Sequence, residues 1–142
     1  MENTVLRLEK RIKADPERLF RAWVTPKNFA RWFLAGSTVK LGNVTLDARP
    51  GGRFRIDMIV EGVLRPHEGE YRVVDEPHRL VFTWRSFMTR DTDTLVTVTF
   101  TPEGDSTLIT LIHERIIGEM EFAAHRDGWT SILEGLTTWI TA

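Results

Sequence analysis

Among the side chains of this sequence that can carry chemistry, His113 stands at the most informative position. It ends the apolar run STLITLIH, and strand alternation puts it on the same side as Ile109 and Leu111. An imidazole at the inward end of such a strand can orient a ligand or move a proton. It can also be a buried histidine that is simply hydrogen-bonded at the end of a strand. The sequence leaves both interpretations open.

The other histidines do not extend this site. We expect His67 and His78 in turns and His125 near the start of a terminal helix. No two histidines have the close sequence spacing of metal ligands, and the chain contains no cysteine. We therefore expect neither a metal nor a cofactor.

Three other motifs are too incomplete to predict a catalytic residue. Asp91 and Asp93 alternate in a polar loop that lacks the glycine and the distal glutamate of a calcium loop. Pro50-Gly51-Gly52 lacks the Lys-Ser/Thr pair of a phosphate-binding loop and fits a hairpin turn. No serine lies in a G-x-S-x-G elbow. The sequence thus favours a binding protein over an enzyme, without deciding the question.

Aromatic side chains are the second notable feature, with five tryptophans and eight phenylalanines against one tyrosine. Such rings either fill a core or line a pocket. Strand alternation gathers many of them on one face, and any part of that face left unfilled would form a pocket for an apolar molecule. The alternative is that every inward residue simply packs. The candidate ligand-binding residues are Trp32, Phe33, Phe54, Met58, Tyr71, Phe82, Trp84, Phe100, Leu111, His113 and Trp129.

These residues depend on a set of β-strands separated by short turns. Short connections between consecutive strands predict antiparallel hairpins, because parallel crossovers need a dozen or more residues. Alternation puts Tyr71 and Val73 on the inward face, and Arg55, Asp57 and Thr97 on the outward face. The seven predicted strands are TVLRLEKRI (4–12), VTLDA (44–48), RFRIDMIV (53–60), HEGEYRVV (67–74), RLVFTW (79–84), LVTVTFT (95–101) and STLITLIH (106–113).

Helix signals lie on either side of the strand-rich region. Asp15-Pro16 and Thr25-Pro26 each provide a cap and a proline for a first helical position, so two short helices should follow the first strand. The tandem aromatics 32–33 then either cover a cavity mouth or anchor the helix pair to the sheet. After Gly118 a stripe of apolar residues predicts a long terminal helix. We expect its glycines, 128 and 135, to allow close approach of another element.

Composition bounds the class of protein. The chain has 142 residues and a formal net charge of -1, which provides no field for attracting nucleic acid. The first 13 residues do not resemble a signal peptide, and no apolar run is long enough for a membrane span. We expect one domain over residues 1–142, no membrane insertion and a cytoplasmic location. A homodimer is left open.

The order of strand, two helices, six strands and terminal helix resembles the START-like, or SRPBCC, helix-grip superfamily. Within it, the sequence is similar to the family named after the activator of the heat-shock protein 90 ATPase. This resemblance implies an α+β helix-grip fold, with a curved antiparallel sheet of about seven strands around the long C-terminal helix. It is carried by segments along nearly the whole chain, namely 20–23 (FRAW), 31–33 (RWF), 49–54 (RPGGRF), 69–71 (GEY), 80–84 (LVFTW), 96–100 (VTVTF) and 128–129 (GW), with Leu133 and Leu136.

Three functions are compatible with this resemblance. The first is a protein that binds an apolar or amphipathic small molecule in its cavity. The second is a protein-interaction module, which the family name links to chaperones, although the chain lacks room for the separate chaperone-binding domain of the eukaryotic branch. The third is an enzyme of the cyclase or hydrolase kind. A fold shared by many activities does not decide among them.

Overall fold

Antiparallel strands form one curved sheet in the computed structural model, which describes residues 5–142. The strand order is β1-β7-β6-β5-β4-β3-β2, so the first strand pairs with the last and the others follow the chain. The predicted helix-grip sheet is therefore confirmed; Thr4, the predicted start of the first strand, lies outside the described residues. The bounds are β1 (Leu6–Ile12), β2 (Lys40–Leu46), β3 (Arg53–Val60), β4 (Val63–Asp75), β5 (Arg79–Trp84), β6 (Thr94–Glu103) and β7 (Ser106–Glu114).

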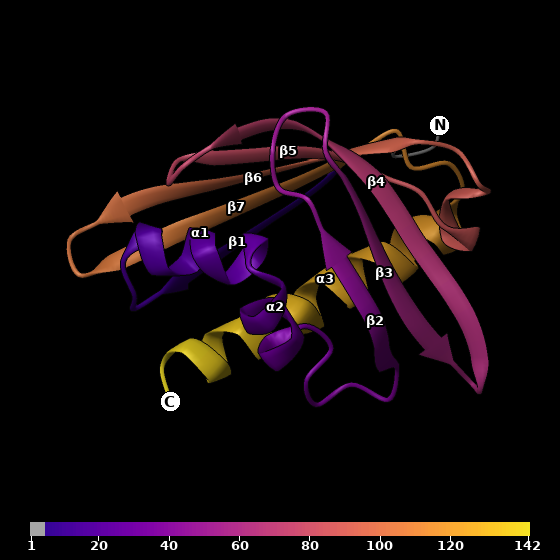
Figure 1. Ribbon diagram of the computed structural model, residues 1–142, viewed down its shortest axis with the longest axis horizontal. Coiled ribbons are helices and arrows are strands. Elements are labelled where there is room, and N and C mark those ends of the chain that lie inside the picture. The colour runs from indigo at the N-terminus through magenta and orange to yellow at the C-terminus, as the bar shows by residue number, and fades with distance from the viewer. Residues whose placement is uncertain (1–4) are drawn as a thin grey trace.

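The helices close the concave side of this sheet (Figure 1). Asp15 caps the first of them by accepting a hydrogen bond from the backbone N–H of Arg18 at 2.8 Å, as the sequence predicts. The long C-terminal helix runs along the inside of the sheet, and the two short helices lie beside its C-terminal half. The bounds are α1 (Pro16–Val24), α2 (Pro26–Trp32), the short 3-10 helix η1 (Phe87–Thr89) and α3 (Glu119–Ile140).

Strand β4 bends so that its first half pairs with β3 and its second half with β5. Gly69 lies at this bend, where a Cβ atom would meet the carbonyl oxygen of Thr83 and the ring of Phe54. The register between β4 and β5 then shifts between Tyr71 and Val73, which is a β-bulge. The sheet can therefore curve tightly over α3.

The same bulge overturns one predicted orientation. Tyr71 pairs with inward Phe82, but Val73 pairs with Val81, and it is Val74 that pairs with inward Leu80 and packs against the core. The prediction that Val73 shares the inward face of Tyr71 is therefore wrong. Simple alternation fails here because the extra residue changes the parity of every position after it.

The remaining inward strand positions are buried as the alternation predicts, from Phe54 on β3 to His113 on β7. Helix α3 buries the opposing side chains of Trp129, Ile132, Leu133, Leu136 and Ile140. On the outward face, Asp57 departs from prediction because it is buried beneath the irregular part of β2 and accepts a hydrogen bond from Arg55 at 2.8 Å. Across residues 5–142, no helix is long and apolar enough to cross a membrane.

Candidate ligand-binding site

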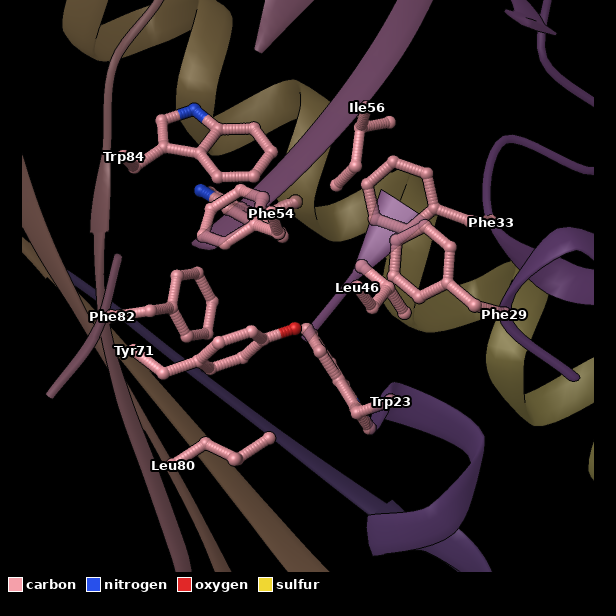
Figure 2. Close-up of a pocket in the computed structure, with 11 residues that line it drawn as sticks. Trp23, Phe29, Phe33, Leu46, Phe54, Ile56, Tyr71, Leu80, Phe82 and Trp84 are labelled. Carbon is pink, nitrogen blue, oxygen red and sulfur yellow. The ribbon is translucent and has the colours of Figure 1, made fainter. Parts of the chain in front are cut away.

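Two cavities lie between the sheet and the helices, and they differ greatly in size. The smaller, of about 20 Å³, is the space drawn in Figure 2. Aromatic rings enclose it from both sides, with Phe54 and Phe82 from the sheet and Phe29 and Phe33 from the α2 end. A cavity of this size holds about one water molecule. The most aromatic part of the concave face is therefore filled by its own side chains.

The packing of the short helices explains why so little space remains there. Phe29 and Phe33 stack with ring centroids 4.2 Å apart, and Trp32 lies edge-on to Trp23 at 5.1 Å. Trp32 is fully buried and its Nε1–H donates to the carbonyl oxygen of Ala22 at 2.9 Å. Trp32 thus joins α2 to α1, which is neither the mouth cover nor the anchor to the sheet that the sequence suggested for the tandem aromatics.

The larger cavity has a volume of about 400 Å³ and lies between the middle of α3, strands β3 and β4, the loop before β2, and η1. This volume is within the range of small-molecule sites. Apolar side chains make most of its wall, and among residues 5–142 no arginine, lysine, aspartate or glutamate belongs to it. It is lined by Leu34, Ser37, Val39, Met58, Val60, His67, Trp84, Phe87, Met88, Ala124, His125, Gly128, Trp129, Ser131 and Ile132.

Two tryptophans separate the two cavities. Trp84 and Trp129 line both of them, and their ring centroids are 5.0 Å apart. Trp84 comes from the end of β5 and Trp129 from the middle of α3, so the partition joins sheet to helix. The larger cavity therefore has a rigid aromatic floor, because both indoles are almost fully buried.

Helix η1 forms one side of the larger cavity and is held from both ends. Ser86 and Thr89 form a reciprocal capping box, which explains locally why this short turn forms. Arg90, just after η1, pairs with Glu121 in the first turn of α3 at 3.1 Å. The guanidinium of Arg65 lies 4.4 Å from the ring centroid of Phe87. These contacts fix the wall formed by Phe87 and Met88.

Gly128 lies at the cavity mouth. A Cβ atom built there meets nothing within 4 Å, so the prediction that this glycine allows close approach of another element is wrong. The prediction holds for Gly135, where a Cβ would lie 3.0 Å from the backbone oxygen of Trp32. One glycine of α3 thus keeps a cavity open and the other lets α2 pack against the helix.

His113 lies beneath the partition, and both of its ring nitrogens are used. Trp129 Nε1–H donates to His113 Nδ1 at 3.0 Å, so His113 Nε2 carries the proton and donates to Thr94 Oγ1 at 2.6 Å. The hydroxyl of Thr94 in turn donates to the carbonyl oxygen of Trp84 at 2.6 Å. Burial lowers the pKa of His113 to about 3, which keeps the ring neutral. This is the hydrogen-bonded strand-end histidine that the sequence left as one option.

His67 and His125 do line the larger cavity. His67 lies within β4, in agreement with the predicted strand 67–74 and not with the expectation of a turn, and its Nδ1 is 3.0 Å from the carbonyl oxygen of Arg65. His125 lies on α3 with Nδ1 2.7 Å from the carbonyl oxygen of Glu121. Burial lowers the pKa of His67 to about 4 and also lowers the pKa of His125. Both imidazoles are therefore neutral near pH 7.

The structure divides the predicted site residues into three groups. Met58 lines the larger cavity, and Trp84 and Trp129 line both cavities. Phe33, Phe54, Tyr71 and Phe82 line only the smaller one. Trp32, Phe100, Leu111 and His113 are buried and border neither cavity.

Several wall residues are absent from the sequence-based set, and two of them carried a usable signal. His67 is four residues before inward Tyr71, and His125 is one helical turn before inward Trp129, so both periodicities place them inside. Phe87 and Met88 carried no such signal, because they belong to the short helix η1, whose position beside the cavity is set by tertiary contacts. His113 and His125 approach to 4.8 Å between ring centroids, yet no group of three or more metal-ligating side chains gathers anywhere in residues 5–142.

Comparison with known proteins places this geometry in context. A family model described as activator of Hsp90 ATPase homolog 1-like protein matches residues 13–141. A search of curated proteins found no match.

Solved structures share the fold. Protein CV1439 from Chromobacterium violaceum is 25% identical, with a TM-score of 0.82 over 96% of each chain. A protein from Rhodobacter sphaeroides is 22% identical, with a TM-score of 0.83 over 97% of this chain and 93% of its own. DynU16, a protein of the dynemicin biosynthetic locus, is 20% identical with a TM-score of 0.82; the match covers 99% of this chain but 48% of DynU16.

Proposed function

We propose that this chain, which belongs to the family of activator of Hsp90 ATPase homolog 1-like proteins, binds an apolar or amphipathic small molecule in its larger cavity. Family and fold support a ligand-binding helix-grip domain, working here as one unit over residues 1–142. The ligand is bound between the middle of α3 and strands β3 and β4.

The observation that carries this proposal is a pocket of about 400 Å³ that reaches from the exposed side of α3 to the buried tryptophans of the partition. Small-molecule sites are typically concave, mostly apolar pockets of this size with a few polar groups in the wall. The smaller cavity of about 20 Å³ shows that the same aromatic face can be filled. A large unfilled space beside it is best explained as room for another molecule.

The wall chemistry supports an apolar ligand. Met58, Met88, Ile132 and the two partition tryptophans offer apolar surface, whose burial contributes about 25 cal/mol per Å². Methionine suits such a wall because its flexible thioether adapts to the shape of the guest. Binding should therefore depend chiefly on the fit of nonpolar surface.

Pyrene fluorescence tests the proposal, because the tryptophans of the partition can transfer energy to a probe in the cavity. We expect saturable binding to the wild type and at least a ten-fold weaker affinity for Gly128→Leu, which narrows the mouth. Thr130→Leu adds the same side chain to an exposed position of the same helix and should bind like the wild type.

Native mass spectrometry of protein purified from its own host provides the second arm. A retained small molecule supports the carrier function. If pyrene is not taken up and no molecule is retained, the cavity is not a binding site and the proposal is wrong; the interaction module would then take its place.

The enzyme interpretation receives less support from this geometry. His113 is the histidine that the sequence singles out for acid-base chemistry, but its two nitrogens are committed to Trp129 and Thr94. A general base needs a free nitrogen within reach of the reacting group, and His113 does not offer one. Binding is therefore the function that the arrangement supports best.

A further inference from the structure

Two imidazoles in the wall of the larger cavity have a fixed tautomer. The Nδ1 of His67 and the Nδ1 of His125 each lie within hydrogen-bond distance of a backbone carbonyl, at 3.0 and 2.7 Å. A carbonyl oxygen only accepts, so each Nδ1 carries the proton and donates it. In a neutral imidazole the other nitrogen, Nε2, then has a lone pair and acts as an acceptor.

These two Nε2 atoms have no partner within the described chain. The buried side-chain polar atoms without a partner in residues 5–142 are Trp23 Nε1 and Trp84 Nε1, so the histidine Nε2 atoms border accessible space. His67 lies on the concave face of β4, and His125 lies on the face of α3 packed over it. The accessible space in question is the larger cavity, which both residues line.

The absence of ionised side chains from the described cavity wall indicates whether the ligand carries a charge. No arginine, lysine, aspartate or glutamate side chain belongs to the described cavity wall. Of the charged groups close to it, Arg90 pairs with Glu121, Asp57 pairs with Arg55, and the guanidinium of Arg65 lies over the ring of Phe87. A buried carboxylate would meet two lone pairs and no cation, while a buried ammonium would meet no counter-ion. The other polar groups of the wall are the hydroxyls of Ser37 and Ser131 and the indole N–H groups of Trp84 and Trp129. Trp129 Nε1–H already donates to His113, and Trp84 Nε1 is buried away from accessible space. The site thus disfavours either sign of charge.

We propose that the ligand is a largely apolar, uncharged molecule with a hydroxyl or other neutral hydrogen-bond donor, which it directs at Nε2 of His67 or His125. This inference rests on the proposed function, since it specifies the polar end of the molecule that the cavity binds. Each imidazole is held in place by its backbone bond at Nδ1, so the acceptor is oriented before the ligand arrives.

Three pyrene derivatives measured at pH 7 test the inference, because they share one apolar body. Hydroxypyrene should bind about five-fold more tightly than methoxypyrene, which cannot donate, since one neutral hydrogen bond contributes about 1 kcal/mol. Pyrenecarboxylate should bind the weakest of the three. The long-range ¹H–¹⁵N spectrum of the histidines should show the Nε2 resonance of His67 or His125 moving with hydroxypyrene and staying in place with methoxypyrene.

Variants identify which imidazole accepts. His67→Phe and His125→Phe keep a ring but remove the acceptor, and the double variant should bind hydroxypyrene and methoxypyrene equally. His78→Phe changes a histidine in the β4–β5 turn, away from the cavity, and should keep the wild-type preference. The nitrogen spectrum of the wild type decides the question even if a variant fails to fold.

The outcomes separate this inference from the proposed function. If hydroxypyrene and methoxypyrene bind equally and no histidine nitrogen moves, the donor requirement is wrong while the apolar cavity remains a binding site. If pyrenecarboxylate binds best, the charge argument is wrong. If none of the probes binds, both proposals fall together.

Discussion

Trp129 and Trp84 lie in contact at the centre of the interior, yet their indole nitrogens have different surroundings. Trp129 Nε1–H donates to His113, whereas Trp84 Nε1 is buried without a partner. A buried polar group that loses its partner costs about 1–3 kcal/mol, whereas removal of an unpartnered one costs no hydrogen bond. The two residues therefore form a natural pair for comparison.

Replacement of each tryptophan by phenylalanine removes the same atoms with different consequences. We expect Trp129→Phe to lower the free energy of unfolding by about 1–3 kcal/mol more than Trp84→Phe, because only Trp129→Phe leaves His113 Nδ1 unpaired. Urea denaturation of both variants measures this difference. Equal losses would show that the Trp129–His113 hydrogen bond makes no net contribution to the free energy of unfolding.

The buried histidines also predict how stability responds to acid. Burial lowers the pKa of His67 from 6.5 to about 4 and that of His113 to about 3. Between pH 6.5 and pH 4 these histidines are protonated in the unfolded chain but stay neutral in the folded protein. The free energy of unfolding therefore falls as the pH is lowered through this range. At pH 4 the free energy of unfolding should have fallen by on the order of 3 kcal/mol for each of these two histidines.

Denaturation curves between pH 7 and pH 4 check this expectation, with stability greatest above pH 6.5. For His67→Phe, the free energy of unfolding should depend less steeply on pH, because unfolding near the middle of this range takes up about one proton fewer than in the wild type. Thr97→Ala, which leaves every histidine in place, should follow the wild type. A stability that does not change over this range would mean that these imidazoles remain hydrated in the folded protein.

At the scale of elements, helix α3 contains two glycines whose roles differ with what lies opposite. Gly128 faces open space at the cavity mouth, and Gly135 faces the backbone oxygen of Trp32 at 3.0 Å from a Cβ position. Glycine within a helix costs about 1 kcal/mol relative to alanine. At Gly128 the missing side chain leaves the mouth of the cavity open, and at Gly135 it permits the contact with α2.

Alanine at each position should therefore have opposite effects. Gly128→Ala should stabilise the protein by about 1 kcal/mol, because the helix gains propensity without a clash. Gly135→Ala should be neutral or destabilising, because its Cβ forces α2 and α3 apart. Thermal unfolding of the two variants compares them directly, and stabilisation by both would show that the α2–α3 contact yields easily.

At the scale of the whole molecule, the cavity couples stability to binding. A ligand that binds only the folded state raises the free energy of unfolding by about 2.7 kcal/mol at a concentration of one hundred times its Kd. We expect hydroxypyrene to stabilise the wild type by this amount, with a smaller effect on Gly128→Leu at the same probe concentration. Urea curves with and without probe measure it. If the probe binds by fluorescence but the urea curve does not change, the probe binds the folded and unfolded states equally and its site is not the cavity.

The division between what could and could not be predicted follows from the range of the forces involved. The sequence by itself determined the order of the elements and the inward face of most strands, because caps, prolines and periodicity act over a few residues. Phe54, Phe82, Leu111 and His113 are inside for that reason. The exceptions are Val73, displaced by a bulge that belongs to the pairing of two strands, and Asp57, covered by β2.

Only the tertiary structure decided which part of the interior stays empty. Trp23 and Phe29 belong to the two short helices and Phe33 directly follows the second, and these three rings fill the space beside Phe54 and Phe82. No side chain of residues 5–142 fills the corresponding space beside Met58, where η1 and Gly128 border a cavity instead. A void is a property of several elements packed together, so no local pattern encodes it. The candidate site is accordingly displaced from the face richest in aromatic residues to the space beside it.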